Sequence, residues 1–171
     1  MYEFLKTAQS PKVIAEAVKL IGTKEIVGSK HNETILDWAE ELGLKTIYTN
    51  DEIPWCGLFV AHVVKKAGFE VVNKPLWALS WSNWGQAVTI PMFGDVLTFK
   101  RNGGGHVGFY VGEDENCYHV LGGNQSNAVN VIRIEKKRLH KARRCQWKVA
   151  QPEAVKVIKL SAKGYISKNE A

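Results

Sequence analysis

The chain has 171 residues, of which 45% are hydrophobic, and this is enough for one domain with a buried core. No apolar run approaches the roughly 18 residues of a transmembrane helix, so no such segment is expected. The formal net charge of +6 favours anionic partners, and the three widely spaced cysteines form neither a metal motif nor a disulfide framework. We therefore expect synthesis in a reducing cytoplasm, with no cofactor and no bound metal.

The first part of the chain is predicted to be helical. Ser10 and Pro11 predict the start of a helix over Lys12–Ile21, and Asn32 predicts the cap of a second helix over Glu33–Leu42. Both segments carry apolar residues at helical spacing, so we expect each to pack one face against the core. The first residues lack a basic region followed by an apolar region and a cleavage site, so we expect no Sec signal peptide.

The next predicted helix begins at a cysteine. Pro54 precedes Cys56, apolar residues follow with a 3.6-residue period, and Gly68 is placed to end the helix. A thiol on the first turn of a helix lies beside unpaired N–H groups and the positive end of the dipole, which favour the thiolate. The competing interpretation of this stretch alone is a small buried cysteine beneath a helix.

A helical or irregular segment over Trp77–Trp84 contains Trp77, Trp81 and Trp84. Tryptophans at this density line the sugar-binding grooves of some proteins, but more often they form part of the hydrophobic core. Both interpretations stay open at this point.

From residue 94 the pattern changes to short strands separated by turns rich in Gly, Asn and Asp, which indicates an antiparallel meander. The predicted strands cover residues 94–99, 106–111, 118–121 and 128–134. Residues 147–149 and 155–160 can each add a strand, and the last ten residues are predicted to be a loose tail. Helices first and strands after predict a single α+β catalytic domain over residues 1–150, followed by a C-terminal extension over 151–171.

Six basic residues crowd into the nine positions 136–144. Such a run attracts nucleic acid, anionic lipid or an anionic wall polymer, and the alternative is a solvated basic strand edge. No motif that recognises RNA or DNA accompanies it, so we expect no specific nucleic-acid partner. The residues are Lys136, Lys137, Arg138, Lys141, Arg143 and Arg144.

Cys56, His106 and Asn124 follow one another in the order that a thiol hydrolase needs. A thiol nucleophile needs an imidazole to take its proton and a third group to orient the ring. His106 opens a predicted strand after three glycines, and Asn124 follows the next strand. A helix that carries the cysteine and packs on a sheet that carries the other two residues is the papain-like arrangement. We therefore predict a papain-like α+β fold, with the nucleophile at the start of a central helix.

Four blocks resemble the signature blocks of a phage and prophage group among the NlpC-type and CHAP (cysteine, histidine-dependent amidohydrolase/peptidase) peptidoglycan hydrolases. These blocks are Asp51–Cys56, Gly94–Val96, Gly105–Gly112 and Leu121–Val129, and the resemblance extends over residues 13–147. It implies Cys56 as the nucleophile and His106 as the general base.

The resemblance does not decide the third catalytic residue. Many CHAP enzymes carry a glutamate two residues before the asparagine of the last block, and that position here is Gly122. Asn124 is our candidate, because an asparagine carbonyl suffices in papain-type enzymes, and His119 is the alternative.

The remaining site residues are weaker predictions. The oxyanion hole would combine the backbone N–H of Cys56 with one upstream side chain, for which Tyr48 and Asp51 lie at a suitable sequence distance. Gln125 is predicted to help line the site. A metal site at Cys117 and His119 is disfavoured, since their i, i+2 spacing has no partner pair.

By this resemblance the protein is expected to be endolysin-like, cutting an amide bond in the peptide part of bacterial peptidoglycan. The enzyme would be an endopeptidase or an N-acetylmuramoyl-L-alanine amidase. We expect a monomer made in the bacterial host cytoplasm that reaches the wall through a membrane lesion. The alternatives are an injected antibacterial effector or a tail-associated lysin with the same chemistry, and a catalytically silent wall-binding module.

Overall fold

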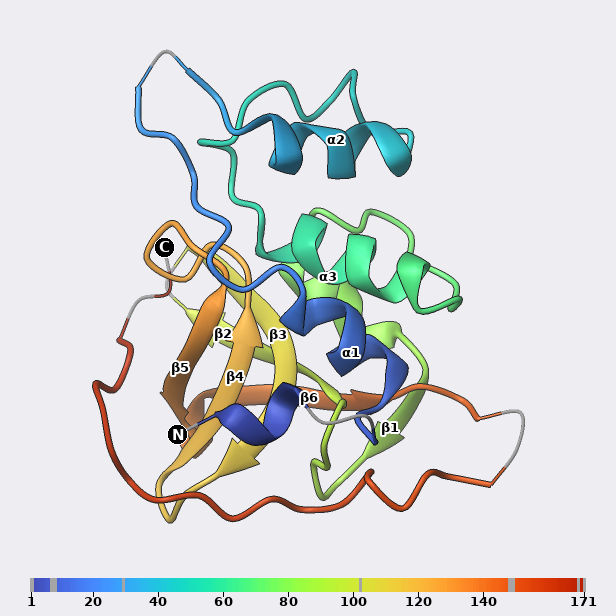
Figure 1. Ribbon diagram of the computed structural model, residues 1–171, viewed down its shortest axis with the longest axis vertical. Coiled ribbons are helices and arrows are strands. Elements are labelled where there is room, and N and C mark those ends of the chain that lie inside the picture. Colours follow the sequence, from blue (N-terminus) through green and yellow to red (C-terminus); the bar gives the residue numbers. More distant parts are fainter. Residues whose placement is uncertain are drawn as a thin grey trace.

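The computed structural model describes residues 2–6, 9–28, 30–101, 103–147, 150–168 and 170. Its helices come mainly from the first half of the chain, and its strands form one antiparallel sheet from the second half, as the α+β prediction requires (Figure 1). The α-helices lie above and in front of the sheet in this view, and the C-terminal segment runs around the outside of the sheet.

The helices lie close to where the sequence predicts them. They are α1 (Lys12–Val18), α2 (Glu33–Glu41) and α3 (Cys56–Lys66), with short 3₁₀ turns η1 (Glu3–Lys6), η2 (Ala78–Asn83) and η3 (Lys136–Arg138). Asn32 caps α2 as expected, because its side chain accepts a hydrogen bond from the N–H of Thr34. Ser10 does not cap α1: Pro11 occupies the N-cap, and the Ser10 hydroxyl donates to the carbonyl of Leu5.

The sheet has the strand order β1-β6-β2-β3-β4-β5. Four of its strands match predicted segments, and β1 and β6 were not predicted. In β3, His106 lies opposite Phe99 of β2, which places it near the start of this long strand. The strands are β1 (Gln86–Val88), β2 (Val96–Arg101), β3 (Gly104–Glu113), β4 (Cys117–Gly122), β5 (Asn130–Glu135) and β6 (Leu139–Arg144).

The basic run forms η3 and β6, and β6 lies inside the sheet between β1 and β2. The alternative of a solvated basic strand edge is therefore right about a strand but wrong about its position at an edge. Arg144 forms a buried bidentate pair with Asp95, and Arg138 forms one with Glu170. Lys136 and Lys137 pair with Glu113 and Glu135, respectively. Much of the positive charge is thus neutralised within the fold.

Alternation along the strands gives the sheet two apolar faces. Val107, Phe109 and Val111 of β3 join the main core, which also contains the inner faces of the α-helices. Tyr110, between them, faces a smaller cluster on the other side of the sheet with Leu97 and Phe99. In Figure 1, β6 runs across the direction of β4 and β5, so the sheet is strongly twisted.

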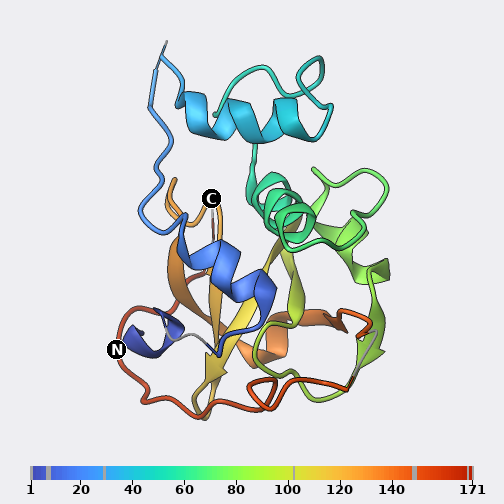
Figure 2. The same ribbon diagram turned by 45° about the vertical axis from the view of Figure 1, so that its right-hand side comes forward.

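The C-terminal segment is docked at several points, unlike the loose tail that was expected. Residues 158–160 pair with Glu113 at the end of β3, through hydrogen bonds of 2.8 Å in both directions. Farther along, Ile166 forms a parallel bridge with Arg133 of β5, and the N–H of Ser126 donates to the carbonyl of Glu170 over 3.1 Å. This last contact holds Glu170 beside the turn between β4 and β5, whose strands can be followed in both ribbon views (Figures 1 and 2).

Two of the weaker strand predictions have different outcomes. Residues 155–160 contribute an isolated parallel bridge between Lys159 and Glu113 and no regular strand. The predicted strand over residues 147–149 falls mostly outside the described residues.

Candidate active site

The start of α3 is enclosed by neighbouring backbone. Cys56 is the first residue of the helix and is 5% exposed. A Cβ atom at Gly57 would lie 2.4 Å from the carbonyl oxygen of Pro75, so only glycine lets this chain segment pass so close. Two residues beyond Pro75, Trp77 is 72% exposed. The residue after the candidate nucleophile therefore lies against a crossing segment, and an exposed aromatic ring follows in that segment.

The thiol of Cys56 lies against the strand that carries His106. Burial raises the pKa of Cys56 above its ordinary value, while hydrogen bonding to the backbone N–H groups of Val107 and Gly57 and the charge of Arg101 lower it. Val107 is the residue after His106, so the thiol reaches the β3 backbone at this position. Among the described contacts there is no hydrogen bond between Cys56 and His106; such bonds are often long before substrate binds.

The ring of His106 is oriented by Gln125. The Nε2 atom of His106 and the Oε1 atom of Gln125 are 2.9 Å apart in the protein interior. The side-chain NH₂ of Gln125 donates to the carbonyl of Asn130 over 2.6 Å and to the carbonyl of Val120 over 3.3 Å. Because both partners are acceptors, Oε1 must be the atom that faces His106. The imidazole then donates from Nε2, and Nδ1 is the nitrogen able to accept a proton.

Two glycines make room for this arrangement. A Cβ atom at Gly122 would lie 2.6 Å from Oε1 of Gln125 and 3.3 Å from Nε2 of His106. A Cβ atom at Gly123 would lie 2.5 Å from Cβ of Phe59, on the first turns of α3. The Gly-Gly pair therefore lets the turn after β4 fit between the His106 ring and the cysteine helix.

The surroundings of His106 favour the neutral form of its ring. Burial lowers the pKa of His106 to about 4, against the opposing influence of the Glu170 charge and the Gln125 hydrogen bond. The charges of Arg101 and Arg138 lower the pKa of His106 further. A neutral imidazole is the protonation state that a general base requires.

The hydrogen bond that we assigned to Asn124 is made by its neighbour. Gln125, predicted only as a lining residue, contacts the ring, and Asn124 adopts a left-handed conformation with φ of 53° in the turn before it. Gly122 was the feature of the sequence that could have indicated Gln125. Many CHAP enzymes carry a glutamate at this position, and a glycine there leaves space for another side chain. It could not be interpreted without the geometry of the turn.

Of the two weaker oxyanion candidates, Tyr48 lies near the nucleophile. Its side chain is buried, its hydroxyl donates to the carbonyl of Ile53 over 3.1 Å, and burial, with added influence from Asp51, Glu25 and Cys56, raises the pKa of Tyr48. The hydroxyl is thus already engaged as a donor.

Asp51 organises the loop before α2. Its carboxylate accepts hydrogen bonds from the N–H groups of Ile26 and Asn32 and contacts the His31 ring at 3.0 Å. Burial raises the pKa of Asp51, but these hydrogen bonds outweigh it and hold the pKa below its ordinary value. A carboxylate in this state cannot donate to an oxyanion, so the structure does not support that assignment for Asp51.

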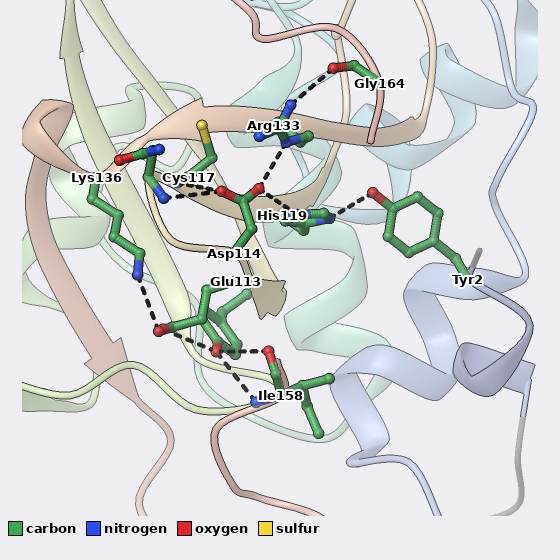
Figure 3. Close-up of polar contacts among 11 residues, drawn as sticks. Tyr2, Glu113, Asp114, Cys117, His119, Arg133, Lys136, Ile158 and Gly164 are labelled. Atoms are coloured by element: carbon green, nitrogen blue, oxygen red, sulfur yellow. Dashed lines mark hydrogen bonds and ion pairs between the residues drawn. The ribbon is translucent and has the colours of Figure 1, made fainter. Parts of the chain in front are cut away.

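His119, the alternative third residue, belongs to a separate polar cluster. Its Nε2 atom lies 2.9 Å from Asp114 and its Nδ1 atom 2.7 Å from the hydroxyl of Tyr2 (Figure 3). Arg133 donates to the same Asp114 oxygen over 2.7 Å. Both ring nitrogens of His119 are therefore occupied by residues that take no part in the Cys56 region, and the alternative is not supported.

The tryptophans of residues 77–84 divide between the two interpretations left open by the sequence. Trp81 is fully buried and Trp84 nearly so, and both donate to backbone carbonyls. Trp77 is exposed beside the segment that crosses the start of α3. Two of the three are thus core residues, and the third is available to a ligand.

The described part of the chain contains no helix long and apolar enough to cross a membrane. Within the same residues, no group of three or more metal-ligating side chains comes together. No protein-family model matches the chain, and no curated protein matches it either.

Proposed function

We propose that this chain is a cysteine-dependent hydrolase with a papain-like catalytic arrangement. The single observation that carries the proposal is the hydrogen bond between Gln125 and His106, next to the cysteine at the start of α3. It fixes one ring nitrogen as a donor and leaves the other available as a base, which is the role of the third residue in thiol hydrolases. The proposed substrate is an amide bond in the peptide part of bacterial peptidoglycan.

In the first step, Nδ1 of His106 accepts the proton of the Cys56 thiol as the sulfur attacks the carbonyl carbon of the amide. The developing oxyanion is stabilised by the backbone N–H of Cys56, at the positive end of α3. When the C–N bond breaks, His106 returns the proton to the leaving amine. The product bound to the enzyme is a thioester on Cys56.

In the second step, a water molecule replaces the leaving amine. His106 removes a proton from this water as it attacks the thioester, and the collapse of the intermediate releases a carboxylic acid and the free thiol. Gln125 keeps the ring in one orientation through both proton transfers. We assign no cofactor to this sequence, because every step uses groups of the chain or water.

The resemblance of the sequence blocks supports peptidoglycan as the substrate, and the exposed ring of Trp77 beside the start of α3 supports a large ligand that stacks on this surface. We propose the setting of an endolysin, made in the cytoplasm of the bacterial host and acting on the wall after a membrane lesion. Effector and tail-lysin settings use the same chemistry and differ in delivery.

The test is digestion of purified sacculi by the unchanged protein and by Cys56→Ala, with mass spectrometry of the released fragments. We expect new amino and carboxyl ends from the unchanged protein and at least a roughly 1,000-fold lower rate from the variant. Cys145→Ala is the matched control, because it also removes a buried thiol and should keep full activity. Equal rates for Cys56→Ala and the unchanged protein would refute the mechanism, and binding of sacculi without fragments would instead indicate a silent wall-binding module.

A further inference from the structure

The candidate site is closed in this structure. Cys56 is 5% and His106 2% exposed, while Gln125 is fully buried. An amide substrate therefore cannot reach the sulfur without displacing part of the chain. The C-terminal segment reaches the turn that carries Gln125, where the N–H of Ser126 donates to the carbonyl of Glu170.

Glu170 is held by a paired hydrogen bond from Arg138. The Nη1 and Nη2 atoms of Arg138 lie 2.7 Å and 2.9 Å from the two carboxylate oxygens, and the Glu170 residue is 1% exposed. This two-pronged geometry is how a guanidinium recognises a carboxylate specifically. Arg138 also donates to the carbonyl of Ser167 over 3.1 Å, so it holds the C-terminal segment at two points.

Glu170 is held at the turn that carries Gln125, the partner of the His106 ring, because the N–H of Ser126 donates to the carbonyl of Glu170 over 3.1 Å. After burial, its charge has the largest influence on the pKa of His106, ahead of the Gln125 hydrogen bond. The influence is mutual: burial raises the pKa of Glu170, but the Arg138 hydrogen bond and the His106 charge lower it. The ion pair of Glu170 and Arg138 thus lies within electrostatic range of the proposed general base.

We propose that Arg138 forms a carboxylate-binding site for the substrate, and that Glu170 occupies this site as an internal competitor. The ligand class is a peptide with a free carboxylate near the amide to be cut. Peptidoglycan stem peptides have this chemistry, so the inference rests on the proposed function for its substrate. Substrate binding at Arg138 and docking of the Glu170 carboxylate are then mutually exclusive, so Glu170 competes with the substrate in the unchanged protein.

The C-terminal segment has a second anchor that does not depend on Glu170. Arg133 donates to the carbonyl of Gly164 over 2.8 Å, and Lys159 pairs with Glu113 (Figure 3 shows the Arg133 contact). Release of Glu170 therefore frees only the last residues, while the rest of the segment stays attached. We call the Arg138–Glu170 pair the latch. Each of its two residues can be substituted without changing the second anchor.

The experiment compares Glu170→Gln and Arg138→Gln in the full chain, with Lys137→Gln as the control from an exposed pair. The first readout is the rate at which iodoacetamide alkylates Cys56, followed by peptide mapping so that Cys117 and Cys145 are counted separately. Either variant breaks the latch, so both should speed alkylation about tenfold over the unchanged protein and over Lys137→Gln.

The second readout separates the two roles. The probes are the tripeptide L-Ala-γ-D-Glu-L-Lys and its counterpart with the glutamyl α-carboxylate converted to an amide, with affinities measured by calorimetry on chains that also carry Cys56→Ala. Glu170→Gln should bind the carboxylate peptide about tenfold more tightly than the unchanged protein and prefer it over the amide. Arg138→Gln should show no preference. Arg138→Lys keeps the positive charge but cannot form two parallel hydrogen bonds. Its preference for the carboxylate peptide should lie between those of Glu170→Gln and Arg138→Gln.

The proposal is overturned if alkylation rates do not change, if Glu170→Gln does not prefer the carboxylate peptide, or if Arg138→Gln retains the preference. Circular dichroism and the melting temperature of each variant establish that it is folded, and a folded Arg138→Lys decides the matter if Arg138→Gln is not. These readouts do not use catalysis. Carboxylate preference without cleavage of sacculi would refute the proposed function alone, and cleavage without preference would refute the Arg138 site alone.

Discussion

Two buried histidines on neighbouring strands of one sheet have opposite surroundings. His106 on β3 has one ring nitrogen bonded to Gln125, and the described contacts give the other nitrogen no hydrogen bond. His119 on β4 has both nitrogens bonded, one to Tyr2 and one to Asp114. Of these four ring nitrogens, only Nδ1 of His106 has no hydrogen bond among the described contacts, and it is the nitrogen that the proposed mechanism uses as a base. Hydrogen-bond occupancy, more than burial, distinguishes the two roles.

Asp114→Asn disrupts the polar cluster around His119 and so tests its structural role. The Asp114 carboxylate accepts from Arg133 and from backbone N–H groups as well as contacting His119. Burial raises the pKa of Asp114, but these partners hold it well below its ordinary value. Loss of the charge leaves a nearly buried guanidinium unpaired, so we expect the free energy of unfolding to fall by about 3 kcal/mol.

Urea denaturation measures this loss, and digestion of sacculi under native conditions supplies the contrast. The rate of the folded Asp114→Asn protein should stay within about threefold of the unchanged rate, because the cluster touches no reacting group. A large fall in rate without a fall in stability would place His119 in the catalytic machinery after all.

Gln125→Leu removes the hydrogen bond that holds the His106 ring. Leucine has a similar volume but no acceptor, so Nε2 of His106 loses its partner and the ring is no longer held in one tautomer. We expect kcat to fall about 100-fold with little change in KM. Gln125→Glu keeps an acceptor for Nε2 but loses the donors to the carbonyls of Val120 and Asn130, so we expect it to be less stable and, when folded, to lose less kcat than Gln125→Leu. Equal losses of kcat in both folded variants would contradict an orienting role.

The pH dependence of stability sharpens the comparison for His106. Burial lowers its pKa in the folded protein to about 4 from an ordinary value of 6.5, so the unfolded chain binds the extra proton first as the pH falls. This contribution to stability is complete above pH 6.5 and is lost between there and pH 4, up to about 3 kcal/mol. Urea titrations at several pH values should show a flatter profile for His106→Asn than for the unchanged protein. Identical profiles would mean that the ring is not desolvated.

The smallest expected effect belongs to Asn124, the residue that the sequence favoured. Its φ of 53° is easily adopted by glycine, so Asn124→Gly removes the side chain without straining the turn. We expect the rate to change by less than about threefold, against the large loss for Gln125→Leu. A loss of about 100-fold for Asn124→Gly would restore the original assignment of the third residue.

Local patterns predicted much of the fold. The apolar period and glycine stops placed α2 and α3 within a residue or two, and alternating patterns located β2 to β5. The strand β6 was missed because its sequence, Leu139–Arg144, is mostly basic. In the interior of the sheet, Asp95 neutralises the charge of Arg144 in this strand. Asp95 is far from Arg144 in the sequence. No local pattern contains that information.

The same division applies to the candidate site. The order of Cys56 and His106, together with the helix start, was readable from residue types. The choice between Asn124 and Gln125 depends on the conformation of the turn after β4, in which Asn124, Ser126 and Asn127 are left-handed and the Gln125 side chain contacts His106. The docking of Glu170 depends on a long-range ion pair. Both require the path of the backbone in three dimensions.

The crowding at Gly122 has a consequence for comparing sequences. A side chain at residue 122 and the amide of Gln125 would occupy one space, since a Cβ there would lie 2.6 Å from the glutamine oxygen. The orienting group can therefore be supplied from either position but not from both at once. Among sequences of this type, the two positions should covary: an acidic residue at the first with a small or outward residue at the second, or glycine at the first with glutamine at the second. An alignment that scores each position separately would count glycine at residue 122 as the loss of the acidic residue. The imidazole would nevertheless keep a hydrogen-bond partner, supplied from residue 125.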